Sequence, residues 1–301
     1  MSAAFMGPQA ARTVFGAKNA VLAWGAGAAG KAIAGKDGYR ITGKWSFASG
    51  SRHATWLGAH CKAFEADGRP RLRADGRHAE ITGLFPRSTA TIHDVWQVMG
   101  LKGTGSDTYE VSDVVVPAEL TLDREDFDEL RVEATVFKFP TTMAYSAGFS
   151  GVMLGIARGA LDDLMALAMA KTPRGAVSSM RDSANLQFDL ARFEARWRAL
   201  KALQMATVRE VWGSVEAGAP LTLQNRVDWR LATTHAINEG AQIVMEVYRL
   251  AGQTAIFEEH PFEQRLRDAL SASQQVQGRV THYTTVGRHL LGLPLDTTMF
   301  I

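Results

Sequence analysis

The sequence predicts an α+β protein: an antiparallel β-barrel or sandwich followed by an antiparallel four-helix bundle. Two observations predict this fold class. Turn signals recur at short intervals before Pro117, and beyond Pro140 the apolar residues change from a period of two to a helical period. The 301 residues also suffice for two domains, because single cores stop growing near roughly 250–300 residues. We expect an entrance segment at residues 1–20, a β-domain at 21–135 and a helical domain at 136–301.

Charge and cysteine content narrow the classes of function. The formal net charge is +2 at pH 7 and like charges form no long runs, which argues against nucleic acid or an anionic membrane as the main partner. The single cysteine, Cys61, excludes an internal disulfide and a zinc–cysteine cluster, and we expect it in the core. No basic leader begins the chain, and no apolar stretch approaches the ~18 residues that a membrane helix needs. We therefore expect a soluble cytoplasmic protein.

A polar loop at residues 48–53 lies between the strands predicted at 39–47 and 55–64. Tyr, Ile and Trp alternate in the first strand, as in a half-buried sheet. The loop sequence, Ala-Ser-Gly-Ser-Arg-His, combines hydroxyls, a cation and a flexible glycine, which can line a cleft for a flat or anionic ligand. The same residues are ordinary chemistry for a hairpin turn. Both interpretations stay open from the pattern alone.

A glycine run at residues 25–30 follows a possible strand at 21–24, and a short helix is possible at 9–15. A dinucleotide-binding fingerprint would require a helix directly after these glycines. The next residues, Lys-Ala-Ile-Ala-Gly-Lys-Asp-Gly, instead predict a strand and a turn. We therefore interpret the run as a flexible connection.

Four long helical elements are predicted beyond Pro140. The first, at about residues 142–170, is apolar or small nearly all round, so we expect it at the centre of the bundle or at a subunit interface. Two amphipathic helices follow, and a final helix from 261 to about 291 completes the bundle. Predicted breaks lie at residues 172–175, 217–220 and 251–252.

Several motifs resemble the acyl-CoA dehydrogenase superfamily, in the order in which that family has them. The first motif resembles the flavin-facing strands of the oxygen-using branch of that superfamily and reads Gly38-Tyr-Arg-x-x-Gly-x-Trp-x-Phe-x-Ser-Gly50. This branch contains two-component hydroxylases of phenols and dibenzothiophene-type monooxygenases. The stretch from Trp96 to Asp107 is similar to a second family signature. The helical half carries three further similar motifs, Gly155-Ile-Ala-Arg-Gly-Ala-Leu-Asp162, Pro261-Phe-Glu-x-Arg-x-Arg-Asp268 and Gly287-Arg-His-Leu-Leu-Gly292.

The resemblance implies a flavin, FMN or FAD, held between the barrel and the bundles of neighbouring subunits, usually in a tetramer. It also implies a reduced-flavin monooxygenase that acts on a small aromatic or other organic substrate, with a flavin reductase as a possible partner. Ser49 would meet the edge of the flavin ring near its reactive nitrogen, where its hydroxyl would hydrogen-bond the ring. Lys171 is a candidate phosphate contact or simply a solvated helix end. The expected cofactor contacts are Phe47, Ser49, Gly50, Ser51, Lys171 and Gly252.

The chain departs from the family pattern at three places. It begins where the family's first helical domain has already ended, so we expect the wall that this domain provides to be missing. Gln275 stands where the hydroxylase branch has a histidine, and Val276 or Gln277 stands where dehydrogenases have a glutamate base. None of these side chains shuttles a proton near neutral pH. Ala170 replaces the arginine that meets the FAD pyrophosphate, which disfavours tight FAD and leaves FMN, reduced flavin or no flavin.

The predicted catalytic residues are Ser49, His53 and Gln275. His53 shares the polar loop with Ser49, and His282 or His289 is a candidate to substitute for the missing histidine. Two other functions remain open. One is an acyl-CoA dehydrogenase-type oxidoreductase, and the other is a truncated, catalytically silent paralogue that acts as an oligomerising partner subunit.

Overall fold

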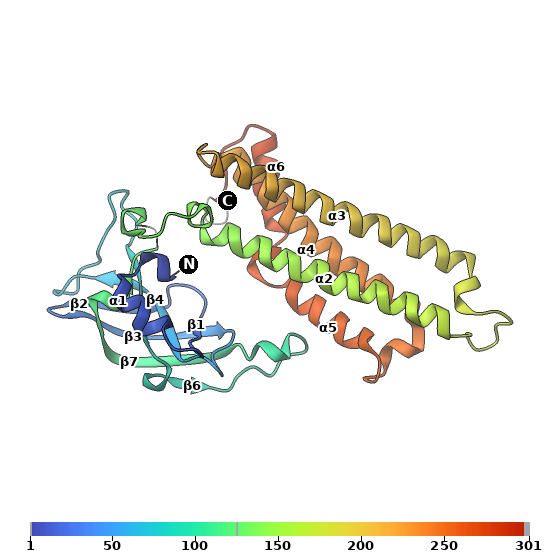
Figure 1. Ribbon diagram of the computed structural model, residues 1–301, viewed down its shortest axis with the longest axis horizontal. Helices are drawn as coiled ribbons and strands as arrows, with labels where there is room; N and C mark the ends of the chain where they lie inside the picture. The colour runs from blue at the N-terminus through green and yellow to red at the C-terminus, as the bar shows by residue number, and fades with distance from the viewer. Residues whose placement is uncertain (1, 125, 298–301) are drawn as a thin grey trace. The chain divides into compact units, whose positions relative to one another are not determined.

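The computed structural model describes residues 2–124 and 126–297, which fall into two compact units. Unit 1 comprises Met1–Val98 and Lys102–Glu133, and unit 2 comprises Met99–Leu101 and Ala134–Ile301. Unit 1 contains the strands and unit 2 contains the long helices (Figure 1). The α+β class that the sequence predicts is confirmed.

Unit 1 is built around one eight-stranded sheet, preceded by the short helix α1 (Pro8–Phe15). The strand order is β6-β7-β3-β2-β4-β5-β8, and β1 pairs with β4 outside this path. The strands are β1 (Leu22–Trp24), β2 (Gly30–Gly35), β3 (Gly38–Ala48), β4 (Trp56–Phe64), β5 (Glu80–Pro86), β6 (Thr91–His93), β7 (Asp107–Pro117) and β8 (Thr121–Leu122).

The pairing differs from the purely antiparallel sheet that we expected. Both β1 and β2 run parallel to β4, β1 opposite Trp56–Gly58 and β2 opposite Cys61–Phe64. Because β2 turns back at Gly38 to pair antiparallel with β3, it lies between β3 and β4 in the sheet. The polar loop at residues 48–53 is therefore a crossing connection over an intervening strand, and its interpretation as a hairpin turn is wrong.

The core of unit 1 explains the glycine run. Trp45 of β3 is fully buried, donates from Nε1 to the carbonyl of His60 at 2.8 Å and stacks on Tyr109 with ring centroids 5.2 Å apart. A Cβ on Gly30 would lie 2.2 Å from Cζ2 of the Trp45 ring, which no side chain tolerates. Gly30 therefore makes room for the Trp45 indole, and Gly25 makes room for its Cβ, which a Cβ on Gly25 would approach to 2.4 Å. The strand β2, and not a helix, follows the run. Cys61 is buried in the same core, as expected, and burial raises the pKa of its thiol to about 12.

Unit 2 is a bundle in which the predicted final helix is broken. A 3-10 turn at Val276–Gly278 separates α5 from α6, because this turn carries Gln277 into the interior, where its Oε1 accepts a hydrogen bond from Nη1 of Arg230 at 2.7 Å. The helix α2 packs against α3, α4 and α5 and still exposes Val152 and Met169. The helices are α2 (Thr141–Ala170), α3 (Ala184–Glu216), α4 (Leu223–Ala251), α5 (Pro261–Ser273) and α6 (Thr281–Leu290).

One short segment from the middle of the sequence belongs to unit 2. Met99–Leu101, which we call the strap, is held by α5: Asp268 accepts from the backbone N–H of Leu101 at 2.6 Å, and Arg267 donates to the carbonyl of Met99 at 2.6 Å. A Cβ on Gly100 would lie 2.1 Å from the carbonyl oxygen of Arg267, so the strap approaches α5 as closely as backbone allows. The motif residues Arg267 and Asp268 therefore serve packing within unit 2.

Candidate functional site

A bulge at the end of β3 turns an aromatic side chain outward. Between the pairs Trp45–Tyr109 and Ala48–Asp107, two residues of β3 face one residue of β7. Phe47 lies in this bulge with a φ of 58°, a left-handed conformation that is rare for residues other than glycine. Its ring is 65% exposed and meets the ring of Trp96 edge-on at 6.0 Å. Such strain at an exposed aromatic is typical of ligand-binding sites.

The residues that follow, 47–53, form a structure that we call the Ser49 loop. Backbone hydrogen bonds from Ser51 to Ala48 and from His53 to Gly50 make successive tight turns. A further bond from the Gly50 N–H to the carbonyl of Thr104, at 2.9 Å, ties the loop to the segment before β7. The loop is therefore fixed on both sides before any ligand binds.

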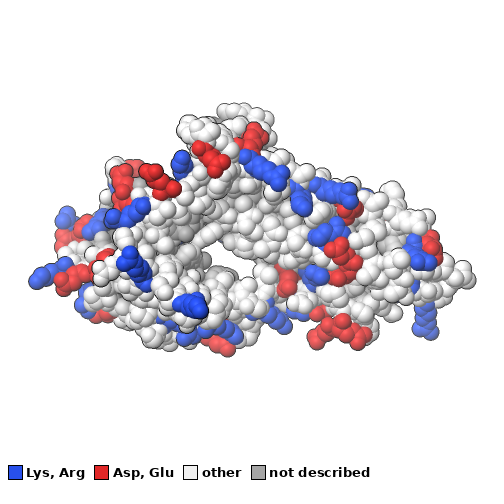
Figure 2. All heavy atoms as spheres, in the orientation of Figure 1, with Lys and Arg blue, Asp and Glu red and all other residues white. Residues whose placement is uncertain are grey.

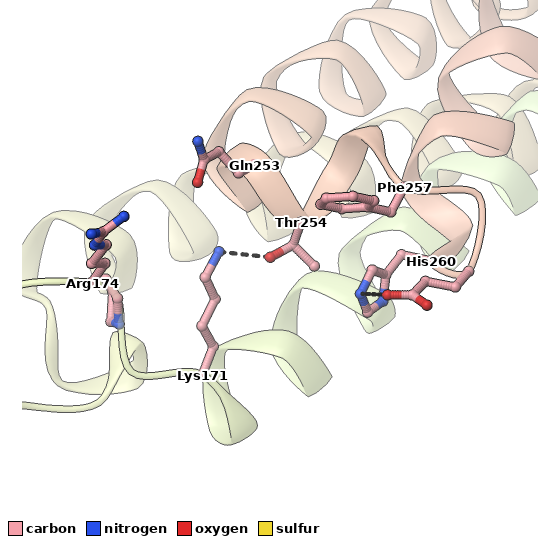
Figure 3. Close-up of a pocket in the computed structure, with 8 residues that line it drawn as sticks. Lys171, Arg174, Gln253, Thr254, Phe257 and His260 are labelled. Carbon is pink, nitrogen blue, oxygen red and sulfur yellow. Dashed lines mark hydrogen bonds and ion pairs between the residues drawn. The ribbon is translucent and has the colours of Figure 1, made fainter.

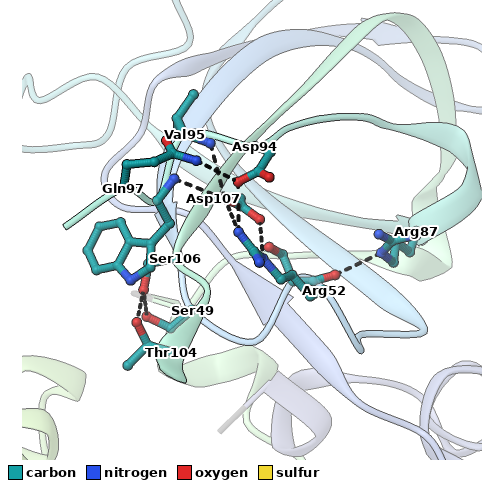
Figure 4. A network of polar contacts seen from close by, with 11 residues as sticks. Ser49, Arg52, Arg87, Asp94, Val95, Gln97, Thr104, Ser106 and Asp107 are labelled. Atoms are coloured by element: carbon teal, nitrogen blue, oxygen red, sulfur yellow. Dashed lines mark hydrogen bonds and ion pairs between the residues drawn. The ribbon is translucent and has the colours of Figure 1, made fainter. Parts of the chain in front are cut away.

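A buried carboxylate, that of Asp107, holds the Ser49 loop through Arg52 (Figure 4). Asp107 is 2% exposed and accepts hydrogen bonds from Arg52 at 2.7 and 3.1 Å and from the backbone N–H groups of Val95 and Trp96 at 3.2 and 3.3 Å. The hydrogen bonds from Arg52, more than any other cause, lower the pKa of Asp107 below its usual value. Asp107 is therefore a fixed anion that orders this region, and it does not act as a proton carrier.

Three hydroxyls lie in a row, one from the Ser49 loop and two from the segment before β7 (Figure 4). The Oγ atoms of Ser49 and Ser106 are 2.7 Å apart, and Oγ1 of Thr104 is 2.7 Å from Oγ of Ser106. Ser49 is exposed at one end, while Ser106 is 4% exposed in the middle. Ser106 and Thr104 were not among the predicted site residues, because hydroxyls that flank Gly105 are equally typical of a plain turn.

The other predicted residues of this loop have different surroundings. Ser51 is fully buried, and its carbonyl accepts from Nε of Arg87 at 2.7 Å. His53 is exposed, and its ring lies 3.5 Å from the position that a Cβ would take on Gly50. Only Phe47, Ser49 and His53 therefore direct accessible side chains from the residues predicted in unit 1.

A second polar cluster lies in unit 2, around the end of α2 (Figure 3). Lys171 donates from Nζ to the carbonyl of Ala251 at 3.0 Å and to Oγ1 of Thr254 at 2.8 Å, so the helix end is tied to the end of α4 and is not simply solvated. Gly252, with a φ of 64°, makes the turn that brings Thr254 there. An open pocket of about 360 Å³ is lined by Lys171, Pro173, Arg174, Gln253, Thr254, Phe257, Glu259 and His260.

Arg174 and Thr254 were not among the predicted site residues. Both lie in predicted breaks or beside them, where polar residues are normally assigned to solvent. The available signal was the cation at 174, three residues after Lys171 in a segment containing proline and glycine. Two cations and a hydroxyl at one pocket suit an anionic group such as a phosphate.

Gln275 lies in a third region, residues 274–280, which we call the Gln275 turn. Its side-chain Oε1 accepts from the backbone N–H of Gln277 at 2.6 Å, so it caps its own turn. His282 is 4% exposed, with Nε2 2.8 Å from the carbonyl of Val276, and burial is the largest cause that lowers its pKa. His289 lies 2.9 Å from Oε1 of Gln224.

The surface charges, the metal-ligating side chains and the helix hydropathy of the described residues give three further observations. Basic and acidic side chains are intermixed over the face in view, as the near-balanced charge predicts (Figure 2). Among residues 2–124 and 126–297, no group of three or more His, Cys, Asp or Glu side chains is arranged to hold a metal ion. No helix in that part of the chain is both long and apolar enough to cross a membrane.

Comparisons with known proteins cover nearly the whole chain. Residues 147–277 match the family "Acyl-CoA dehydrogenase, C-terminal domain". An indole-3-acetate monooxygenase of Pseudomonas putida is 31% identical over 258 residues, which are 85% of this chain and 63% of that protein. The oxygenase subunit HsaA of a flavin-dependent monooxygenase from Rhodococcus jostii is 28% identical, over 90% of this chain and 70% of its own.

The solved structures agree on the fold. The structure of XiaF from a Streptomyces species, in complex with FADH2 and glycerol, superposes with a TM-score of 0.86 at 22% identity and covers 98% of this chain and 75% of that one. The matched proteins extend beyond this chain, which spans about three fifths of the length of the Pseudomonas protein. The helical half therefore matches the C-terminal domain family of acyl-CoA dehydrogenases, and the relatives that the chain resembles span both of its units.

Proposed function

We propose that the chain is the oxygenase component of a flavin-dependent monooxygenase that hydroxylates a small aromatic or other organic substrate. The observation that carries this proposal is the Ser49 loop, where an exposed hydroxyl and an exposed aromatic ring project from a rigid bulge. This loop lies within the segment that the chain shares with the monooxygenases it matches. A separate flavin reductase would supply the reduced flavin.

The side chains present fit a flavin. Phe47 and Trp96 offer aromatic contact for a flat ring, and Ser49 offers a hydroxyl that either donates or accepts a hydrogen bond. Lys171 and Arg174 offer cations for a phosphate, which suits FMN or FAD. When bound, reduced flavin supplies two electrons to O2, so that one oxygen atom enters the substrate and the other leaves as water.

The chain's own residues would position the ring, support the loop and transfer protons. Ser49 would orient the ring edge through its exposed hydroxyl, and the Arg52–Asp107 pair keeps the loop in place. His53, exposed on the same loop, is the proposed acid/base toward substrate. Gln275 holds a hydrogen bond but carries no proton to transfer near neutral pH.

The test combines binding with product formation. Reduced FMN and reduced FAD are titrated into the purified chain without oxygen, and then oxygen, a reductase and a panel of phenols and indoles are added. We expect micromolar affinity for reduced flavin and a hydroxylated product that contains one atom from 18O2. Failure of either reduced flavin to bind at micromolar concentration would contradict the proposal.

Lys171 allows the cofactor contacts to be tested apart from turnover. Lys171→Met is expected to weaken FMN binding about 10-fold, because a charged hydrogen bond to phosphate is lost, and to leave riboflavin binding unchanged. Lys201→Met, which removes a lysine that lies over the ring of Trp197 on α3, is the matched control. Equal losses for FMN and riboflavin would show that Lys171 only shapes the pocket.

Assembly and location belong to the same proposal. We infer a homo-oligomer, a tetramer as in the family, because α2 exposes the apolar side chains of Val152, Met165 and Met169. The single reduced cysteine suits the cytoplasm. Sedimentation velocity of the purified chain checks the assembly, and a monomer at micromolar concentration would contradict it.

One observation favours a second candidate, a catalytically silent subunit that partners a longer relative. Gln275 stands at the position where the family resemblance places a histidine, and its side chain is engaged in its own turn. Hydroxylation by the isolated chain would exclude this candidate. Co-purification with a longer relative, together with no turnover by the chain alone, would support it.

A further inference from the structure

The row of hydroxyls at Ser49, Ser106 and Thr104 has a property that a single exposed serine lacks. Each hydroxyl carries one proton and can also accept a hydrogen bond. In each pair of neighbours 2.7 Å apart, one hydroxyl therefore donates and the other accepts. If Ser49 donates inward to Ser106, its lone pairs face outward. If Ser106 donates to Ser49, the Ser49 proton is free to point outward.

The row reverses without moving a heavy atom. Ser106 is 4% exposed, and the backbone of Thr104 is held by the bond from the Gly50 N–H at 2.9 Å. The carboxylate of Asp107, adjacent to Ser106 in sequence, fixes Arg52 from the same loop. With the heavy atoms held in this way, the row changes direction when its hydroxyl protons rotate about their C–O bonds.

We propose that Ser106 is a positioning residue that lets Ser49 act as acceptor toward a reduced flavin and as donor toward an oxidised one. This inference rests on the proposed function. The ring nitrogen N5 carries a hydrogen when the flavin is reduced and none when it is oxidised. A binding site that accommodates both redox forms therefore needs a hydroxyl whose direction can change, and the buried Ser106 supplies the compensating partner.

Removal of Ser106 has unequal consequences for the two redox forms. Toward oxidised flavin, Ser49 still donates its own proton. Toward reduced flavin, Ser49 must accept, and its proton then points at a methyl group and loses its partner under the bound ring. We expect Ser106→Ala to raise the Kd for reduced FMN about 3- to 10-fold and the Kd for oxidised FMN less than about 2-fold.

Thr108 provides a matched control. It is also 4% exposed on β7, and its Oγ1 donates to Oγ of Ser46 at 3.0 Å, outside the Ser49 row. Thr108→Val removes a buried hydroxyl without changing the shape of the side chain, and we expect less than about 2-fold change for either redox form. If Ser106→Ala does not fold, Thr104→Val tests the other end of the row and is expected to shift affinity in the same direction.

The experiment is an anaerobic titration of reduced FMN and an aerobic titration of oxidised FMN into wild type, the single variants and the Ser49→Ala/Ser106→Ala pair. The effect of Ser106→Ala should disappear in the Ser49→Ala background, because Ser106 acts only through Ser49. Equal losses for both redox forms, no loss, or an undiminished effect without Ser49 would overturn the inference and leave the proposed function intact. If wild type binds neither redox form, the proposed function fails and the inference fails with it.

Discussion

The Ser49 loop and the Gln275 turn are both expected from the sequence to face flavin or substrate, yet they use their polar groups in opposite ways. In the Ser49 loop the backbone and a buried carboxylate hold the structure, which leaves Ser49, Phe47 and His53 accessible. In the Gln275 turn the side chains themselves hold the structure, through Gln275 and Gln277. Residue type therefore indicates what chemistry is possible, and the source of local rigidity decides whether a side chain is available for it.

The largest effect is expected where a side chain of the Gln275 turn holds a buried charge. Arg230 is 1% exposed, and Gln277 accepts from its Nη1, so Gln277→Ala should lower the free energy of unfolding by about 3 kcal/mol. Urea denaturation measures the loss. Gln274→Ala, at an exposed position of the same turn, should change it by less than about 0.5 kcal/mol. Equal losses at both positions would remove the distinction between supporting and exposed groups in the turn.

A smaller loss is expected when the support under the Ser49 loop is removed. Asp107→Ala deletes the acceptor for Arg52 and for two backbone N–H groups, which should cost about 2 kcal/mol of unfolding free energy. Asp94→Ala removes the other partner of Arg52, a largely exposed carboxylate, and should cost less than about 0.5 kcal/mol. The same denaturation series tests both. If Asp94→Ala proved as costly, the loop would depend on its surface ion pairs.

The pH dependence of stability sharpens the comparison at the Gln275 turn. Burial, as the largest cause, lowers the pKa of His282 in the folded chain, so below the ordinary histidine pKa of 6.5 the unfolded chain binds more protons. Stability is then present above pH 6.5 and falls as the pH drops below it, by no more than about 1.4 kcal/mol per pH unit for one proton. His282→Gln should reduce this slope in urea denaturation between pH 7.5 and 5.5. An unchanged slope would assign the pH dependence to other groups.

The smallest expected effect is on ligand binding. It compares the Ser49 loop with the Gln275 turn directly. Ser49→Ala should weaken reduced FMN binding about 5-fold, the cost of one hydrogen bond, whereas Gln275→Ala should leave it unchanged because that side chain serves its own turn. Flavin titration of the two variants side by side measures this. A larger loss in Gln275→Ala would break the comparison and make the turn the primary contact.

Much of the fold followed from periodicity, because long helices and alternating strands leave clear patterns. The helices at 141–170, 184–216 and 223–251 and the strands β1, β3 and β4 lie close to their predicted positions. The break between α5 and α6 was missed because it is set by the burial of Gln277 against Arg230 on α4, a tertiary contact that no local pattern encodes.

The candidate site was less predictable than the fold. The position of Ser49 followed from its motif, but the insertion of β2 between β3 and β4 depends on long-range pairing. The partnership of Ser49 with Ser106 joins residues 57 positions apart, so local sequence gives no sign of it. The left-handed backbone at Phe47 likewise arises from a register shift against β7.

The strap has a consequence for recombining this chain with its relatives. A division at residue 134 follows the change from strands to helices, yet it would separate Met99–Leu101 from the helix that holds them. A chimaera that exchanges the helical half must therefore match its own Arg267 and Asp268 to a foreign strap, including the close approach at Gly100. Exchange of the helical half together with the strap keeps each unit's packing whole and is the division that the architecture favours.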